Sequence, residues 1–222
     1  MEWLIIVAVF LIVFLGELGD KTQLIVFNLT LEYEKKYKVG IGATIGFAAI
    51  VTLGVFIGEV VVIFVPILLI SLISGGIFLI IGFLELINAK KLYKEKQGVK
   101  QNEQIDERIE LNRSIAVDNE NSSFLKKIKK NPYIAGFGSI FIMELGDKTQ
   151  LLTITLASIY DSPILVWLGA FFALVSLAWI GVFFGKFIAE RVPKFHLKLV
   201  SSMIFILIGI LILITSFLPI YI

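Results

Sequence analysis

The sequence of 222 residues contains no cysteine, one histidine and five prolines. Disulfides and thiolate metal sites are therefore excluded, and the lone His196 cannot form an imidazole metal site by itself. Charged residues are scarce as well: they make up 17% of the chain, whereas 58% is hydrophobic and the mean hydropathy is +0.93. This composition excludes a soluble globular protein and is typical of a protein that crosses a membrane several times.

Six apolar stretches are long enough to cross a bilayer core about 30 Å thick as helices that rise about 1.5 Å per residue. They cover residues 3–30, 41–65, 67–89, 133–160, 163–188 and 197–218. The first is longer than a straight span requires, so we expect it to tilt or break, with Gly19 as the natural break point. Residues 91–131 are polar and mixed in charge, and they predict a flexible linker with, at most, a short surface helix.

The basic residues indicate how the chain is oriented. Eighteen of its 20 lysines and arginines lie in the first, third and fifth connections, which share one side of the membrane if there are six crossings. The positive-inside rule places that side and the linker in the cytoplasm, with both termini outside. The first apolar run lacks a basic leader and a cleavage pattern, so we expect it to be a membrane helix and not a cleaved signal peptide. Together with the compact linker, this favours a prokaryotic plasma membrane.

The two halves of the chain repeat each other. The heptapeptide Glu-Leu-Gly-Asp-Lys-Thr-Gln occurs at residues 17–23 and, unchanged, at residues 144–150. Each half holds three spans, an odd number, so the second half must enter the membrane upside down. The sequence therefore predicts an all-α integral membrane protein of six transmembrane helices in two inverted repeats, 1–90 and 132–222, joined by the linker 91–131. The same offset of 127 residues aligns, without a gap, Gly42 with Gly169, Pro66 with Pro193, Ser74 with Ser201 and Gly82 with Gly209.

Each heptapeptide places two carboxylates in an apolar span, where a charged side chain costs about 2.5 to 3.5 kcal/mol or more. On a continuous helix the lysine follows the glutamate by four residues, so Glu17 would pair with Lys21 and Glu144 with Lys148. Two such pairs could be salt bridges that only hold helices together. Four acids and two lysines, however, leave two negative charges in a medium that penalises net charge, and this favours an ion site.

The candidate metal ligands are Glu17, Asp20, Gln23, Glu144, Asp147 and Gln150, and the charge-balancing or polar supporting residues are Lys21, Thr22, Lys148 and Thr149. Two protons or one divalent cation would neutralise the excess charge, and a site filled by either in turn has the outline of a metal/proton exchanger. Carboxylate and amide oxygens suit Ca²⁺ and Mn²⁺ and argue against Zn²⁺ and Cu⁺. Mg²⁺ gives up its water too reluctantly for a compact carboxylate cage.

Other glycines and acids have simpler interpretations. Glycine pairs at four-residue spacing predict close helix packing rather than ligand contact. Glu59 and Glu85 have no acidic counterpart in the repeat and lie toward helix ends, so we expect their carboxylates to be solvated at the membrane interface. The glycine pairs are Gly42 with Gly46, Gly54 with Gly58, and Gly181 with Gly185.

The doubled Glu-x-Gly-Asp-Lys-Thr signature, the two three-helix units and the charged central linker resemble the GDT family of Ca²⁺/Mn²⁺:H⁺ exchangers. The resemblance covers nearly the whole chain outside the linker, and neither motif departs from the family pattern. It implies export of Mn²⁺ or Ca²⁺ from the cytosol against protons, with Glu17, Asp20, Glu144 and Asp147 as ligands. The ion would be bound transiently, without a resident cofactor.

Two other functions are compatible with the same residues. A monovalent cation/proton antiporter would use the same acids, whereas a non-transporting scaffold or assembly factor would keep its function when Glu17 and Glu144 become glutamine. An enzyme is not expected, because the sequence shows no nucleophile–base pair and no cofactor-binding loop. The expected partners are a divalent metal ion, protons and the lipid bilayer, and no nucleic acid.

Overall fold

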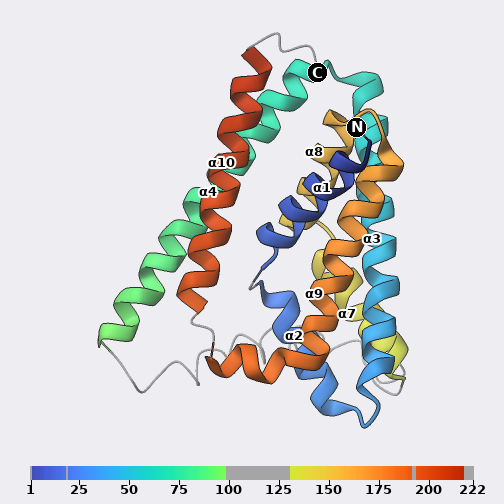
Figure 1. Cartoon of the computed structure of the whole chain (residues 1–222), viewed down its shortest axis with the longest axis vertical. Helices are drawn as coiled ribbons and strands as arrows, with labels where there is room; N and C mark the ends of the chain where they lie inside the picture. Colours follow the sequence, from blue (N-terminus) through green and yellow to red (C-terminus); the bar gives the residue numbers. More distant parts are fainter. Residues whose placement is uncertain (1, 19, 99–130, 192–193, 218–222) are drawn as a thin grey trace, which may run out of the picture.

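The computed structural model describes residues 2–18, 20–98, 131–191 and 194–217, which form helices and the turns that join them (Figure 1). Four of the helices, α3, α4, α9 and α10, are long and apolar enough to span a membrane, and α1 is a shorter apolar helix. The helices are α1 (Glu2–Gly16), α2 (Lys21–Glu32), α3 (Lys36–Phe64), α4 (Ile67–Gly98), α7 (Pro132–Glu144), α8 (Lys148–Ile159), α9 (Pro163–Arg191) and α10 (Lys194–Phe217).

The first and fourth predicted spans each consist of two short helices, α1 with α2 and α7 with α8. The third predicted span continues as α4 to Gly98, so residues 91–98 of the predicted flexible linker are helical. That part of the prediction is wrong, because the polar composition after Ala89 does not end the helix. The remaining linker residues, 99–130, lie outside the described part of the chain.

The two halves run through the molecule in opposite directions (Figure 1). In this view α1 and α2 descend, α3 rises and α4 descends, whereas α7 and α8 rise, α9 descends and α10 rises. The α2–α3 turn, the end of α4, the start of α7 and the end of α9 therefore lie toward the lower end. The start of α1, the α3–α4 and α8–α9 turns and the end of α10 lie toward the upper end.

Local sequence explains several helix starts. The Asn131 side chain accepts a hydrogen bond from the backbone N–H of Tyr133 at 3.0 Å, and Pro132 occupies the first turn of α7, where its missing N–H costs nothing. Pro163 opens α9 in the same way. Pro66 lies between α3 and α4, and its carbonyl accepts from the first turn of α4.

Helices α3 and α9 lie against each other at the centre of the bundle; α3 packs on α7 and α8, and α9 packs on α1 and α2. Glycines of α3 allow this close approach. A Cβ atom on Gly42 would overlap the carbonyl oxygen of Tyr133, and one on Gly58 would lie 2.7 Å from the Cβ of Ala157. The packing role predicted for the glycine pairs of α3 is confirmed.

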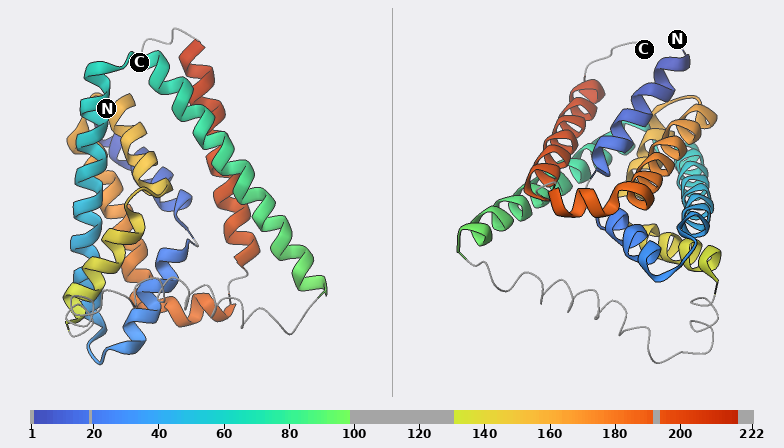
Figure 2. Two further views of the ribbon diagram at one scale, coloured as in Figure 1. Left: turned by 180° about the vertical axis from the view of Figure 1, so that it is seen from behind. Right: turned by 60° about the horizontal axis from the view of Figure 1, so that its bottom comes forward.

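Helices α4 and α10 form a separate pair. Glycines again line the contact: a Cβ on Gly75 would lie 2.7 Å from the side chain of Leu213, and one on Gly82 equally close to Ile206. The pair meets the bundle where α10 contacts α1 and α4 contacts α8. Within the described residues, α2 and α7 make no comparable contact with it, and it diverges from them toward the lower end (Figure 1; Figure 2).

Candidate ion-binding site

Both heptapeptides lie where a helix is interrupted. Helix α1 ends at Gly16 and α2 begins at Lys21, while α7 ends at Glu144 and α8 begins at Lys148. In the second interruption Gly146 has a φ of +86°, a backbone region that glycine enters without steric cost. The expected break in the first span is confirmed, although Gly19, the residue that aligns with Gly146, lies outside the described residues.

The interruptions change the ion pairs from those expected. Because Glu144 and Lys148 belong to different helices, they do not share a helix face, and the predicted pair between them is wrong. The Lys148 Nζ atom instead lies 3.9 Å from Glu17 Oε2 and 3.6 Å from Asp20 Oδ2, both in the first repeat. The Lys21 side chain lies outside the described residues, so its predicted pair with Glu17 stays a prediction.

The two motif glutamates meet at one small cavity. Glu17 and Glu144 are buried, with 3% and 1% of their surfaces exposed, and both line a cavity of about 10 Å³, enough for about one water-sized sphere. Thr22 also lines it and donates a 2.5 Å hydrogen bond from its hydroxyl to Glu144 Oε1. The other lining residues are apolar: Val26, Phe47, Leu174, Leu177 and Ala178.

The Glu144 carboxylate is only partly hydrogen-bonded at this cavity. The second carboxylate oxygen of Glu144, Oε2, is buried and has no hydrogen-bond partner among the described residues. An acid buried in apolar surroundings is stable only when it is protonated or compensated by positive charge. The Lys148 ammonium supplies such charge near Glu17.

The remaining candidate ligands point in different directions. Asp147 is exposed and accepts a 2.7 Å hydrogen bond from the backbone N–H of Lys148, which caps the start of α8. The Gln150 side-chain oxygen accepts from the backbone N–H of Gly146 at 2.6 Å. Thr149 is fully buried. The Gln23 side chain lies outside the described residues.

The structure thus brings Glu17, Glu144 and Thr22 to one cavity, with Asp20 held beside them by Lys148. The side chains of Asp147 and Gln150 instead accept hydrogen bonds from the backbone N–H groups of Lys148 and Gly146. Across the described part of the chain, no three acidic or imidazole side chains are arranged to hold a metal ion.

Sequence reasoning misplaced one acid. Glu85 of α4 was expected to be solvated at the interface, but its Oε1 atom lies 3.2 Å from Lys148 Nζ and only 20% of its side-chain surface is exposed. That prediction is wrong, because α4 packs on α8, the helix that begins with Lys148. An acid within an apolar span marks a functional site by default, and this signal would have found Glu85.

The fold and the site define a multi-pass, all-helical membrane protein with two interrupted helices and a pair of buried carboxylic acids at one cavity. A family model described as "Divalent cation/proton antiporter GDT1" matches residues 5–92 and 132–219. The chain belongs to this family of divalent cation/proton antiporters, which are transporters rather than enzymes. The resemblance drawn from the doubled motif is thereby confirmed.

Two relatives extend over most of the chain. A GDT1-like protein of Synechocystis sp. is 30% identical over 208 residues, which are 90% of this chain and 92% of the relative. A GDT1-like protein of Schizosaccharomyces pombe is 22% identical over 227 residues, covering 90% of this chain and 86% of the relative. No solved structure matches the chain.

Proposed function

We propose that this protein exports Mn²⁺ or Ca²⁺ from the cytosol in exchange for protons, at one site to which both repeats contribute. The observation that carries the proposal is the meeting of Glu17 and Glu144 at a common buried cavity. These residues are equivalent in the two repeats and lie far apart in the sequence. Their oxygens are ligands that Ca²⁺ and Mn²⁺ accept.

Glu17 and Glu144 are the first ligands in this proposal, since both already face the cavity. Six to eight oxygens are usual around Ca²⁺, so further ligands are required. We assign them to the aspartates and glutamines of the same motifs, with lysines and threonines in support. These further ligands are Asp20, Asp147, Gln23 and Gln150, and the supporting residues are Lys21, Thr22, Lys148 and Thr149.

Charge couples the two fluxes. The two motifs together carry four carboxylates and two lysines, so one divalent cation or two protons neutralise the motif residues, and Glu85 beside Lys148 adds one negative charge that is the same in both loadings. An empty, fully ionised site keeps a net charge, and an apolar barrier resists the movement of such a charge. Only the two loadings that offset the motif charge should therefore pass between the two faces of the membrane, which exchanges one cation for about two protons.

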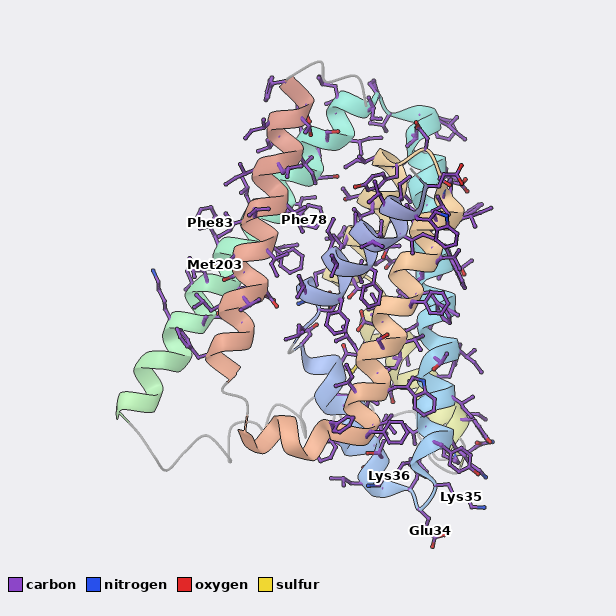
Figure 3. The ribbon with its side chains drawn as sticks, in the orientation of Figure 1. Glu34, Lys35, Lys36, Phe78, Phe83 and Met203 are labelled. Atoms are coloured by element: carbon purple, nitrogen blue, oxygen red, sulfur yellow. The ribbon has the colours of Figure 1, made fainter. Side chains whose placement is uncertain are left out.

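The proposal treats α1 with α2, and α7 with α8, as one crossing each, which gives six crossings in two inverted repeats. The lower end carries Lys35 and Lys36 at the α2–α3 turn (Figure 3). By the positive-inside rule this end faces the cytosol, and both termini are outside. The membrane of the proposal is the plasma membrane of a prokaryotic cell.

Cysteine labelling tests the orientation, and the native chain needs no prior cysteine removal. Single cysteines at Glu34 and Asp161, both exposed and at opposite ends, should react with an impermeant reagent from the cytosolic and the outer side, respectively. The reverse pattern would place the lower end outside the cell and reverse the proposed direction of transport.

Transport itself is tested in inside-out vesicles with an internal metal dye, a clamped voltage and an imposed proton gradient. Mn²⁺ or Ca²⁺ uptake should follow the gradient, and Mg²⁺ and Na⁺ should be poor substrates. A variant in which Glu17, Asp20, Glu144 and Asp147 are all neutralised is the control and should be inactive. Uptake of Na⁺ instead would identify a monovalent cation antiporter, and uptake that ignores pH would exclude proton exchange.

A further inference from the structure

Glu85 lies outside both heptapeptides, yet it is the acid nearest to the lysine of the second one. Its Oε1 atom is 3.2 Å from Lys148 Nζ, whereas Asp20 and Glu17 lie 3.6 and 3.9 Å from the same nitrogen. A donor–acceptor distance of 3.6 Å or more is too long for a hydrogen bond, so the two longer distances are ion pairs without a hydrogen bond. Lys148 therefore directs its hydrogen bonds away from the motif carboxylates.

The hydrogen bonds of the Lys148 ammonium go to two other groups. One is the Glu85 carboxylate, and the other is the backbone carbonyl of Gly16 at 3.2 Å. The ring of Phe205 lies beneath the same nitrogen, with its centroid 5.4 Å away, and contributes a cation–π contact. These three groups, from α4, α1 and α10, fix where the ammonium sits.

Glu85 also departs from the repeat. Phe205 aligns with Phe78, and the two rings stack with centroids 5.9 Å apart between α4 and α10. Glu85, by contrast, aligns with Ile212, an apolar residue that is buried in α10. The position equivalent to Glu85 in the second repeat therefore carries no carboxylate.

We propose that Glu85 is a positioning residue of the transport site, which holds the Lys148 ammonium at a distance from Glu17 and Asp20. An ammonium that bonded fully to those two carboxylates would compete with a divalent cation for the same oxygens. By taking the closest contact, Glu85 leaves Lys148 near enough to compensate their charge but leaves their oxygens available. This inference rests on the proposed function, since it assigns Glu17 and Asp20 to the cation.

The test replaces Glu85 by glutamine, which keeps the shape of the side chain and removes its charge. In the vesicle assay the apparent KM for Mn²⁺ should rise about 10-fold, the size of effect usual for residues that orient metal ligands, while the maximal rate changes much less. Mn²⁺ binding to the purified full-length protein in detergent should weaken by the same factor. Glu85→Asp, which keeps the charge on a shorter side chain, should give a smaller rise in KM.

Glu59→Gln is the matched control. Glu59 is a second acid of the membrane helices without an acidic counterpart, and it is exposed on α3, so KM should stay at the wild-type value. An unchanged KM in both Glu85 variants, or a lost maximal rate with unchanged Mn²⁺ binding, would overturn the inference. If Glu85→Gln does not insert, the Asp variant decides alone. A wild-type protein that moves no divalent cation contradicts the proposed function instead, so the two failures are distinguishable.

Discussion

The two interruptions have identical sequences and different surroundings. The first is covered by α10, whose Ser201 hydroxyl lies within hydrogen-bonding distance of the carbonyl oxygens of Leu15 (3.2 Å) and Leu18 (3.1 Å). The second is open: Leu145, Gly146 and Asp147 are all exposed. The shared heptapeptide thus determines where each helix is interrupted, whereas the packing of α4 and α10 determines which interruption is covered.

The serine of α4 that is equivalent to Ser201 has a different hydrogen-bond partner. Ser74 of α4 aligns with Ser201, but its hydroxyl accepts a 3.1 Å hydrogen bond from Thr155 of α8. The motif aspartates differ likewise, since Asp20 lies beside Lys148 and Asp147 caps its own helix. Under the proposed function the two repeats exchange these arrangements between the two faces of the membrane, so a structure that shows one of them should be unequal in this way.

The largest effect is expected at the residues where the repeats are most alike. Glu17→Gln and Glu144→Gln should each lower divalent-cation flux by about 100-fold or more, because each leaves one cation charge uncompensated within the membrane, at a cost of about 2.5 to 3.5 kcal/mol. Both must act if they share one cavity. Metal uptake by vesicles with matched amounts of inserted protein measures this. A variant with wild-type flux would show that the glutamates serve separate roles.

A second comparison sets Gly42 of α3 against its counterpart Gly169 of α9. A Cβ on Gly42 would overlap the backbone of α7, while one on Gly169 would lie 2.8 Å from the carbonyl oxygen of Ile6 in α1. Gly42→Ala should therefore destabilise the protein by about 1 to 3 kcal/mol, and Gly169→Ala by less. The unfolding temperatures of the two variants in detergent measure this difference.

The control for this comparison is Gly76→Ala, since a Cβ there meets no atom within 4 Å. Its unfolding temperature should equal or exceed that of the wild type, because alanine favours a helix over glycine. Equal destabilisation by all three variants would mean that helix contacts do not decide the result.

Of the two equivalent motif threonines, Thr22 lines the cavity and Thr149 does not. The Thr22 hydroxyl donates to Glu144, so Thr22→Val removes a donor and leaves a buried carboxyl oxygen without its partner. Cation flux should fall about 10-fold, the equivalent of one hydrogen bond to a charged group. Thr30→Val is a suitable control, because the buried Thr30 hydroxyl bonds to Phe27 within its own helix. Equal losses in the two variants would remove the special role of Thr22.

The smallest effect concerns the cover on the first break. Ser201→Ala removes the hydroxyl between α10 and the carbonyls of Leu15 and Leu18, so this break should open more often. A cysteine placed at Leu18 should then react about 2- to 10-fold faster with an impermeant thiol reagent, as expected for one net hydrogen bond. Ser74→Ala should leave that rate unchanged. A faster rate in the Ser74 variant would contradict the assigned asymmetry.

Much of the fold could be predicted because the membrane restricts the possibilities. Runs of apolar residues indicate the spans, since a backbone in lipid must satisfy its own hydrogen bonds as a helix. An overlong first span with a glycine at its centre predicted an interruption, which the structure confirms between Gly16 and Lys21. The glycine spacing in α3 likewise predicted a close contact without naming its partner.

The site was less predictable. A helical spacing of four residues favoured a pair between Glu144 and Lys148, but this rule holds only for a continuous helix, and the motif breaks the helix. Glu85 was misplaced because its partner comes from the other repeat and is recognisable only once α4 is packed on α8. Sequence spacing reports neighbours along one helix, and these contacts join different helices.

By itself, the sequence determined that this protein is a membrane protein of two related halves, with an identical acidic motif in each and no cysteine. Composition and repetition suffice for that, because they depend on the lipid environment and on chain order alone. The tertiary structure decided that Lys148 lies beside Glu17 and Asp20, that Glu85 contacts it, and that α10 covers one break while the other stays open. Those features follow from how α4 and α10 rest on the bundle, and two identical heptapeptides cannot encode a difference between themselves.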